Sequence, residues 1–256
     1  MPVVLNVRVD NLSLTEAREK ARGFLHSSSS HTIFTPNPEM IVKAQADQYF
    51  KDVLNKGSLN LCDGFGLHIV SGARRIAGVD FMMEICQISA EENKSIFLLG
   101  SSSDDIAKKT AEELKTINPS LRIVGHFRGP DINENIKISK QKNCDKRLIV
   151  DETENEIIIQ QINESGAKVV FVAFGMGKQE KWIMENLSKM PQIKIAMGVG
   201  GSFDYISGTV KRAPCWMRRI GLEWGYRFLT QPKRVGRIFN ATIRFIFLVL
   251  ENNFKF

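Results

Sequence analysis

The sequence KVVFVAFGMGKQEKW, residues 168–182, combines an apolar run, a glycine-rich turn and the start of a helical pattern. Residues 168–174 are rich in valine and phenylalanine and make the most hydrophobic strand that the sequence predicts. Glycines at 175 and 177 end this strand, and residues 178–190 follow with a helical pattern. A strand that leads directly into a helix is the repeating unit of a parallel sheet covered by helices.

The same succession of strand and helix recurs along the chain. Further strands are predicted at residues 32–35, 58–62, 95–100, 121–125 and 193–199. Helices are predicted at residues 14–25, 38–54, 64–74, 103–117, 153–164 and 178–190. This alternation predicts an α/β fold with a Rossmann-like, mostly parallel sheet and helices on both faces. Residues 130–151 are rich in Asn, Lys, Asp and Gln and are predicted to form an excursion or a mobile loop.

Positive charge is concentrated at the C-terminal end of the chain. Residues 211–256 hold 10 of the 35 Lys and Arg residues and 2 of the 28 Asp and Glu residues, so they carry +8 and the remainder carries −1. The same segment holds nine aromatic residues, and a cationic, aromatic surface suits an anionic interface such as lipid headgroups or nucleic acid. We therefore predict an α/β core at residues 1–207 and a helical, basic appendage at residues 208–256.

Composition argues against several other classes of protein. A chain with 43% hydrophobic residues is too apolar to be disordered, and four scattered cysteines indicate neither a zinc site nor a disulfide framework. This cysteine usage favours a reducing cytosol. The N-terminus lacks the basic start and apolar block of a secretory signal, so no export is expected. The longest purely apolar run, residues 245–250, is far shorter than the roughly 20 residues that cross a bilayer.

Two helices are predicted within the appendage. Trp216, Ile220, Trp224 and Phe228 recur every four residues, which places them along one helical stripe. After a break at residues 230–232, a second segment has an apolar seam and an adjoining face that carries three arginines, Arg234, Arg237 and Arg244. This basic amphipathic helix is equally consistent with packing on the body, packing on a sister chain and lying on a membrane surface.

Polar residues follow the first two predicted strands of the core, where ligands bind in open parallel sheets. In the motif Thr-Pro-Asn-Pro-Glu, prolines fix the turn so that Thr35 and Asn37 point into a crevice, although Asn37 also suits the cap of a helix. Asp63 precedes a glycine at the start of another helix. A carboxylate there suits a general base, and an Asp-Gly pair also suits a simple turn.

Glycine-rich segments follow the last two predicted strands. The segment at 175–182 lets backbone amides approach a phosphate, with Gln179 as a further donor, and Gly200 and Gly201 precede Asp204, which suits a base or ribose. Two adjacent glycine-rich strand ends favour a nucleotide, although neither a Walker loop nor the full dinucleotide fingerprint is present. No histidine or carboxylate spacing indicates a metal site. If a diphosphate is a leaving group here, protein cations must therefore neutralise it.

The ordered motifs Thr-Pro-Asn-Pro-Glu, Asp-Gly-x-Gly, Lys-Gln-Glu-Lys-Trp, Gly-Gly-Ser-Phe-Asp, Lys-Arg-Ala-Pro and Gly-Leu-Glu-Trp-x-Tyr-Arg resemble the WecG/TagA/CpsF family of bacterial glycosyltransferases. The resemblance implies a metal-independent, inverting hexosyltransferase that needs no cofactor and serves cell-wall polysaccharide biosynthesis. Such an enzyme moves N-acetylmannosamine or its uronic acid from a UDP donor to a polyprenyl-diphosphate-linked saccharide. It would be peripheral on the cytoplasmic face of the membrane, with a homo-oligomer left open and no nucleic-acid partner.

The resemblance also assigns roles to individual residues. Asp63 matches the proposed general base of the family. Residues expected to line the substrate pocket or lie near the nucleotide are Thr35, Asn37, Gln179, Asp204, Gly200 and Gly201. Arg227, Arg234 and Arg237 match arginines of the membrane-docking appendage that complete the active site.

Two other functions are consistent with parts of the sequence. The isoelectric point of about 9.2 and the basic, aromatic appendage suit a nucleic-acid-binding protein, but this function does not explain the polar residues at the strand ends. The glycine-rich strand ends suit an oxidoreductase with a nucleotide cofactor, and the absent fingerprint argues against it.

Overall fold

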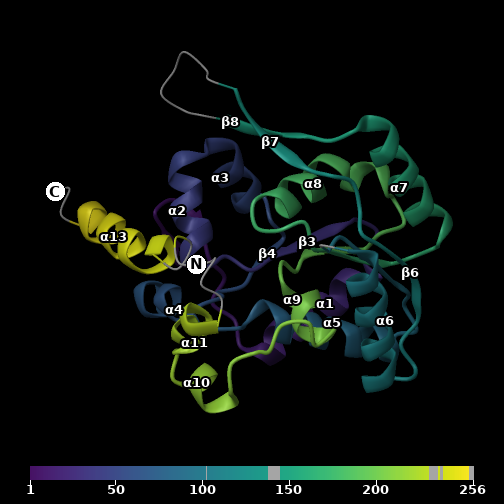
Figure 1. The fold of residues 1–256 in the computed structure, drawn as a ribbon, viewed down its shortest axis with the longest axis horizontal. Coiled ribbons are helices and arrows are strands. Elements are labelled where there is room, and N and C mark those ends of the chain that lie inside the picture. The colour runs from purple at the N-terminus through teal and green to yellow at the C-terminus, as the bar shows by residue number, and fades with distance from the viewer. Residues whose placement is uncertain (102, 138–144, 231–235, 237–238, 254–256) are drawn as a thin grey trace.

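A six-stranded, fully parallel sheet forms the centre of the molecule (Figure 1). The computed structural model describes residues 1–256 except 102, 138–144, 231–235, 237–238 and 254–256. In spatial order the strands are β4 (Leu59–Asn60), β3 (His31–Phe34), β10 (Ile195–Gly198), β9 (Val169–Val172), β5 (Ile96–Leu99) and β6 (Ile123–Phe127). Each strand overlaps one that the sequence predicts, so the predicted parallel sheet is confirmed.

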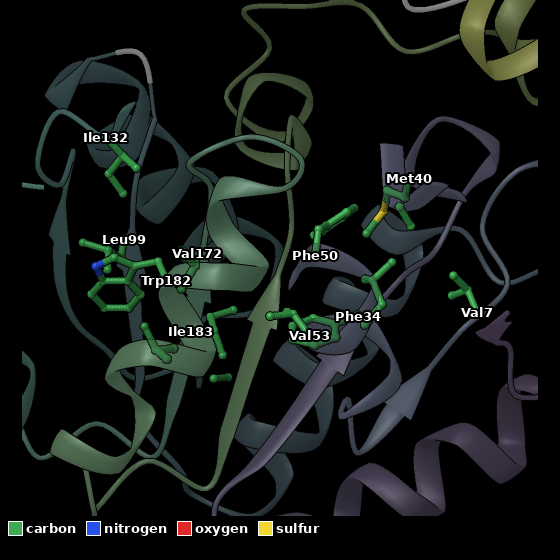
Figure 2. Packing of buried hydrophobic residues seen from close by; sticks show 14 of the residues in the cluster. Val7, Phe34, Met40, Phe50, Val53, Leu99, Ile132, Val172, Trp182 and Ile183 are labelled. Atoms are coloured by element: carbon green, nitrogen blue, oxygen red, sulfur yellow. The ribbon is translucent and has the colours of Figure 1, made fainter. Parts of the chain in front are cut away.

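Strand side chains are buried on both faces of the sheet. In β9, Val169 and Phe171 belong to the hydrophobic cluster on one face, whereas Val170 and Val172 belong to the cluster on the other. All four are fully buried, and burial of each such side chain contributes about 1.5–3 kcal/mol. The second of these clusters also contains Trp182, which is fully buried (Figure 2).

Helices cover both faces of the sheet, as predicted. One face carries α2 (Pro38–Ala46), α3 (Gln48–Asn55), α7 (Glu152–Glu164) and α8 (Lys178–Asn186), the last continued by η1 (Leu187–Lys189). The other carries α1 (Leu14–His26), α5 (Gly78–Glu91), α6 (Asp104–Ile117) and α9 (Ser202–Ile206). A small hairpin of β1 (Val3–Val4) and β2 (Val7–Arg8) and the helix α4 (Phe65–Ser71) complete this part of the chain.

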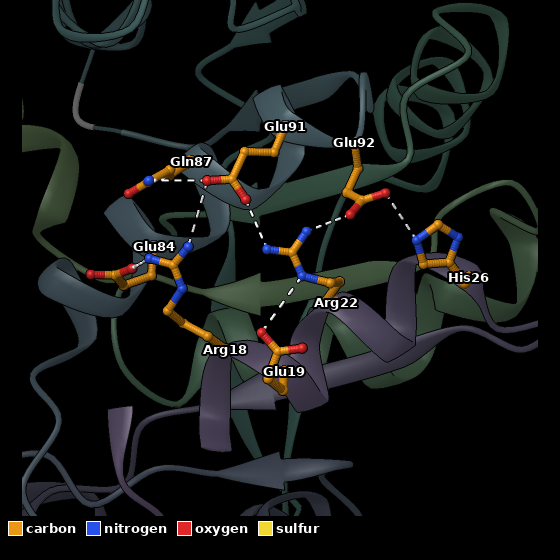
Figure 3. Close-up of polar contacts among 8 residues, drawn as sticks. All are labelled: Arg18, Glu19, Arg22, His26, Glu84, Gln87, Glu91 and Glu92. Atoms are coloured by element: carbon orange, nitrogen blue, oxygen red, sulfur yellow. Dashed lines mark hydrogen bonds and ion pairs between the residues drawn. The ribbon is translucent and has the colours of Figure 1, made fainter. Parts of the chain in front are cut away.

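The helices of the core differ from the prediction in three places: one predicted helix is divided, and the short helix α9 and the longer helix α5 were not predicted. The helix predicted at 38–54 is divided into α2 and α3, because Asp47 has an extended backbone and its side chain accepts from the amide of Phe50 as the cap of α3. Helix α5 was not predicted at all. Arg18 and Arg22 of α1 form ion pairs with three glutamates of the α5 segment, Glu84, Glu91 and Glu92 (Figure 3).

The segment at 130–151 contains a hairpin, and its prediction as a loop was therefore wrong in part. Strands β7 (Asn133–Lys137) and β8 (Asp145–Ile149) pair antiparallel. Glu134 of β7 accepts from Lys181 of α8 at 2.9 Å and from Lys43 of α2 at 2.9 Å. Lys181 is fully buried and also donates to Asp47 at 2.7 Å. Long-range ion pairs thus dock a segment whose composition is too polar to predict a strand.

The appendage packs against the body through its C-terminal helices. It comprises α10 (Cys215–Arg219), α11 (Glu223–Thr230), the π-helical turn η3 (Asn240–Arg244) and α13 (Phe245–Asn253). The predicted helical stripe is interrupted, since Gly221 has φ +80° between α10 and α11. Phe245 is 1% exposed and joins the same cluster as Met40 of α2. Among the described residues, no helix is long and apolar enough to span a bilayer.

Candidate active site

A polar pocket of about 510 Å³ lies across the carboxyl end of the sheet. Every strand of the sheet contributes residues that follow its last position. In strand order along the chain, these include Thr35, Asp63, Ser101, Arg128, Ala173 and Val199. Helices α2, α5 and α8 begin beside the same pocket, so the partial positive charges of their N-termini favour an anionic ligand there.

Most of the site residues predicted from the sequence line this one pocket. They are Thr35, Asn37, Asp63, Gln179, Gly200, Gly201 and Asp204. Of the three predicted arginines, Arg227 lies in α11 but its side chain is outside the described part of the structure. Arg234 and Arg237 lie outside the described residues altogether. The structure therefore brings seven residues together, and their roles remain predictions.

Asp63 is held between the end of β4 and the start of α5. Its backbone amide donates to the carbonyl of Pro36 at 2.9 Å, and its Oδ2 accepts from the amide of Gly78 at 3.3 Å. A Cβ on Gly78 would approach Oγ1 of Thr35 to 2.9 Å, so a glycine lets α5 begin this close to the pocket. The N-terminus of α5 stabilises the negative charge of Asp63.

Asn37 fulfils the capping role that the sequence suggested beside the binding role. Its Oδ1 accepts from the amide of Met40 at 3.0 Å at the start of α2. The residue also lines the pocket, so its capping bond orients the side chain there.

Gln179 is part of a hydrogen-bond chain that joins the two glycine-rich turns. Its Oε1 accepts from the amide of Gly200 at 2.9 Å, and its Nε2 donates to Oε1 of Glu180 at 2.8 Å. The other carboxyl oxygen of Glu180 accepts from the amide of Gly177 at 2.7 Å. Burial raises the pKa of Glu180, although these hydrogen bonds favour its ionised form. The amides of Gly177 and Gly200 thus already donate hydrogen bonds within the protein. The bond from Gly200 to Gln179 stabilises the turn that carries Gly201.

Arg212 is a pocket residue to which sequence reasoning assigned no role at the site. It lies between α9 and α10, lines the polar pocket and donates to both carboxylate oxygens of Asp80, at 2.5 and 2.9 Å. Its motif, Lys-Arg-Ala-Pro, contributed to the family resemblance, but the arginine itself was assigned no role beyond the charge of the appendage.

A second, apolar hollow adjoins the polar pocket. It measures about 380 Å³ and is lined by residues of α4 and of the appendage helices α11 and α13. Figure 1 shows where these three helices lie. Its apolar lining comprises Phe65, Ile69, Val70, Trp224, Phe245 and Ile246. We call this second hollow the apolar groove. Four residues line both hollows, namely Asn37, Glu39, Asp63 and Glu223, so Asp63 lies at the boundary between them.

The polar pocket contains several carboxylates, but these do not form a recognisable metal site. Within the part of the chain that the structure describes, no group of three or more His, Cys, Asp or Glu side chains is arranged to hold a metal ion.

A parallel α/β sheet with a polar pocket across its strand ends is characteristic of enzymes that bind nucleotides. Comparison with known proteins narrows this class. The model of the glycosyl transferase WecG/TagA/CpsF family matches residues 2–256. The chain belongs to this family and is a glycosyltransferase, which confirms the family resemblance and gives no support to a nucleic-acid-binding protein or an oxidoreductase.

Similar curated proteins carry a more specific name. Proteins of Staphylococcus aureus strains MRSA252, NCTC 8325 / PS 47 and COL are each named N-acetylglucosaminyldiphosphoundecaprenol N-acetyl-beta-D-mannosaminyltransferase. Each is 28% identical to this chain over 243 residues, which cover 92% of this chain and 87% of the relative.

Proposed function

We propose that this chain transfers an N-acetylhexosamine-type sugar, N-acetylmannosamine or its uronic acid, from a UDP donor to a polyprenyl-diphosphate-linked saccharide. The names of the Staphylococcus aureus relatives support this sugar and this class of acceptor. The observation that carries the proposal is the position of Asp63, which lines both the polar pocket and the apolar groove. A carboxylate at that boundary can meet both a nucleotide-linked sugar and a lipid-linked one.

In the proposed reaction, Asp63 acts as the general base. It takes the proton from the acceptor hydroxyl as that oxygen attacks the anomeric carbon of the donor sugar. The bond between this carbon and the diphosphate breaks on the opposite side, UDP leaves with the bonding electrons, and the anomeric configuration is inverted. The amide of Gly78, 3.3 Å from Oδ2, orients the carboxylate for this step.

The donor is assigned to the polar pocket. Thr35, Asn37 and Asp204 supply polar groups for the sugar and nucleoside, while Gln179 shapes the turn at Gly200 and Gly201. In this proposal no metal is needed, because protein cations offset the charge that grows on the departing diphosphate. Arg227, Arg234 and Arg237 of the appendage share that task.

The acceptor is assigned to the apolar groove. Its walls are the exposed face of α4 and the helices of the appendage, and Ile69 and Trp224 are 64% and 49% exposed. An isoprenoid chain gains free energy by covering such side chains, at about 25 cal/mol per Å² of apolar surface. Binding there would place the saccharide of the acceptor beside Asp63.

The appendage is proposed to lie on the inner face of the cell membrane. Of the 21 exposed large apolar side chains in the described part of the chain, 11 lie between Trp216 and Leu250. The same segment carries most of the excess positive charge, and each Lys or Arg near an anionic surface contributes about 1 kcal/mol. The division into a core at 1–207 and an appendage at 208–256 is part of this proposal.

Transfer by the purified full chain, measured across a panel of UDP-sugars with a short polyprenyl-diphosphate-linked N-acetylglucosamine, tests the proposal. We expect one N-acetylhexosamine donor to be used, with inversion detected by NMR of the product and no loss of rate in EDTA. Absence of transfer from every UDP-sugar, or retention of configuration, would contradict the proposed reaction. Activity that is lost in EDTA and restored by a divalent ion would contradict metal independence.

A further inference from the structure

A two-pronged ion pair orients Arg212 at the wall of the polar pocket. Asp80, in the first turn of α5, accepts from Nη1 and Nη2 at 2.5 and 2.9 Å, so the plane of the guanidinium is fixed. A second arginine, Arg218, lies 3.9 Å from the same carboxylate. The fork of Arg212 is therefore oriented before any ligand arrives, which reduces the entropy lost when the ligand binds.

Part of the hydrogen-bonding capacity of Arg212 is unused. Its Nε is buried and has no hydrogen-bond partner among the described residues, and the side chain is 20% exposed. Each Nη carries a second hydrogen beyond the one that faces Asp80. A buried, unpaired donor costs free energy unless a ligand or water satisfies it.

The charge around Arg212 is mostly negative. Burial alone would lower the pKa of its guanidinium, but the hydrogen bonds to Asp80 and the charges of Asp80, Glu223 and Asp63 outweigh burial and raise the pKa. Five acidic residues, Glu39, Asp63, Asp131, Asp204 and Glu223, line the pocket, against three basic ones, Arg128, Lys178 and Arg212. An anionic ligand in this pocket needs a fixed cation.

The other two basic residues of the pocket, Lys178 and Arg128, lie at the start of α8 and directly after β6. Nζ of Lys178 donates to the carbonyl of Ile132, so this lysine fastens the segment that leads into the β7–β8 hairpin. Arg128 is exposed and follows β6 at the edge of the sheet. The charge of Asp63 is among the causes that raise the pKa of Arg212, after those of Asp80 and Glu223.

We propose that Arg212 binds the diphosphate of the nucleotide-sugar donor, and that Asp80 positions its guanidinium for this contact. The inference rests on the proposed function, because it takes the donor to be a UDP-sugar. A planar guanidinium can donate two parallel hydrogen bonds to phosphate oxygens, and these bonds strengthen as charge moves onto the departing diphosphate. Arg212 thus supplies a leaving-group cation from a residue anchored to the core through α5, in addition to the arginines further along the appendage.

Calorimetric titration of the full chain with UDP and with uridine tests the proposal, since uridine lacks both phosphates. Loss of a charge-assisted contact should weaken UDP binding by about 10- to 100-fold in Arg212→Ala, with uridine affinity unchanged. Arg212→Lys keeps the charge but loses the forked guanidinium, so its UDP affinity should lie between that of wild type and that of Arg212→Ala. Asp80→Asn should weaken UDP binding less than Arg212→Ala does. Arg219→Ala removes the same charge from an exposed position on α10 and should change neither affinity.

The outcomes separate this inference from the function on which it rests. If the wild-type chain binds no UDP, the proposed UDP donor is wrong. If it binds UDP and Arg212→Ala binds UDP equally well, the inference about Arg212 is wrong while the donor stands. An equal loss of UDP and uridine affinity would make Arg212 a purely structural residue and would also overturn the inference. Should Arg212→Ala fail to fold, the comparison of UDP with uridine in Arg212→Lys and Asp80→Asn decides.

Discussion

The polar pocket and the apolar groove meet at Asp63, yet they are built in different ways. Strand ends and helix N-termini form the pocket, so its polarity comes largely from backbone groups and from side chains fixed by the sheet. The groove is formed by side chains of α4 and the appendage, which cover each other only in part. A polar pocket built on the sheet and an apolar groove built from helices suit one polar substrate and one substrate with a lipid chain.

The two regions also differ in how they are anchored. Residues of the pocket are tied by short hydrogen bonds, such as the chain from Gly177 through Glu180 and Gln179 to Gly200. The groove is anchored mainly through Phe245, which is buried in the core cluster beneath α2. Damage to one half should therefore affect one substrate and spare the other, except at the residues that line both hollows, such as Asp63.

The largest effect is expected at the shared boundary. Asp63→Asn keeps the size of the side chain but removes the base, so turnover should fall by about 10²- to 10⁴-fold while UDP affinity changes little. Asp52→Asn, at an exposed position of α3, is the matched control and should behave as wild type. Turnover of Asp63→Asn within threefold of wild type, measured with saturating substrates, would remove Asp63 from this role.

The polar half was largely predictable from the sequence. Its central strands β10, β9 and β5 are fully buried, and Thr35, Asn37, Asp63 and Asp204 follow strands of the sheet at positions that a parallel arrangement brings together. Helix α5 was missed because it starts at Ala77 and Gly78 without a side-chain cap. Its buried residues Phe81, Met82, Ile85, Cys86, Ile88 and Ser89, at helical spacing, were the available signal.

The other elements were harder to predict because distant residues determine them. The β7–β8 hairpin is joined to the core through Glu134, whose partners Lys43 and Lys181 are 91 and 47 residues away in the chain. The apolar groove forms only where α4 and α13 pack near each other, and the sequence pattern of neither helix indicates that the other is its neighbour. Arg212 was recognised as charge but not as a pocket residue, since its position depends on the ion pair with Asp80.

The hairpin beside the polar pocket offers a test of stability. Burial alone would raise the pKa of Glu134, but hydrogen bonds and charge from Lys181 and Lys43 outweigh burial and lower the pKa. Glu134→Gln should therefore reduce the free energy of unfolding by about 2 kcal/mol near neutral pH.

The pH dependence of this effect follows from the lowered pKa. The stabilisation is complete above the unfolded pKa of about 4.5 and is lost as pH falls through the lower folded value. In urea denaturation at a series of pH values, the gap between wild type and Glu134→Gln should shrink from about pH 6 to about pH 3. Glu156→Gln, at an exposed position of α7, should show no gap. A gap for Glu134→Gln that does not change with pH would contradict the ion-pair explanation.

The groove half can be tested with a matched pair of isoleucines. Ile69 lines the groove on α4 and is 64% exposed, whereas Ile117 on α6 is 60% exposed and lies outside both hollows. Ile69→Glu should raise KM for the lipid-linked acceptor about 10-fold, because a charge and lost apolar contact disfavour the isoprenoid chain. UDP affinity should not change, and Ile117→Glu should leave both quantities unchanged. A rise in KM for the donor alone would show that the two hollows do not divide the substrates.

The smallest effect is expected for the proposed contact of the appendage with a membrane. Arg244 is exposed in η3, and Arg244→Gln should weaken binding to anionic vesicles about fivefold, which corresponds to about 1 kcal/mol for one basic residue. Tryptophan emission reports this binding, because Trp216 and Trp224 of the appendage are 60% and 49% exposed whereas Trp182 is fully buried. Insertion should shift the emission to shorter wavelength, and salt should weaken it. Arg122→Gln, exposed and remote on the sequence from the appendage, is the control. If both variants bind vesicles as wild type does and salt has no effect, the charge of the appendage does not hold it at the membrane. Its exposed apolar side chains would then have to account for the binding to vesicles.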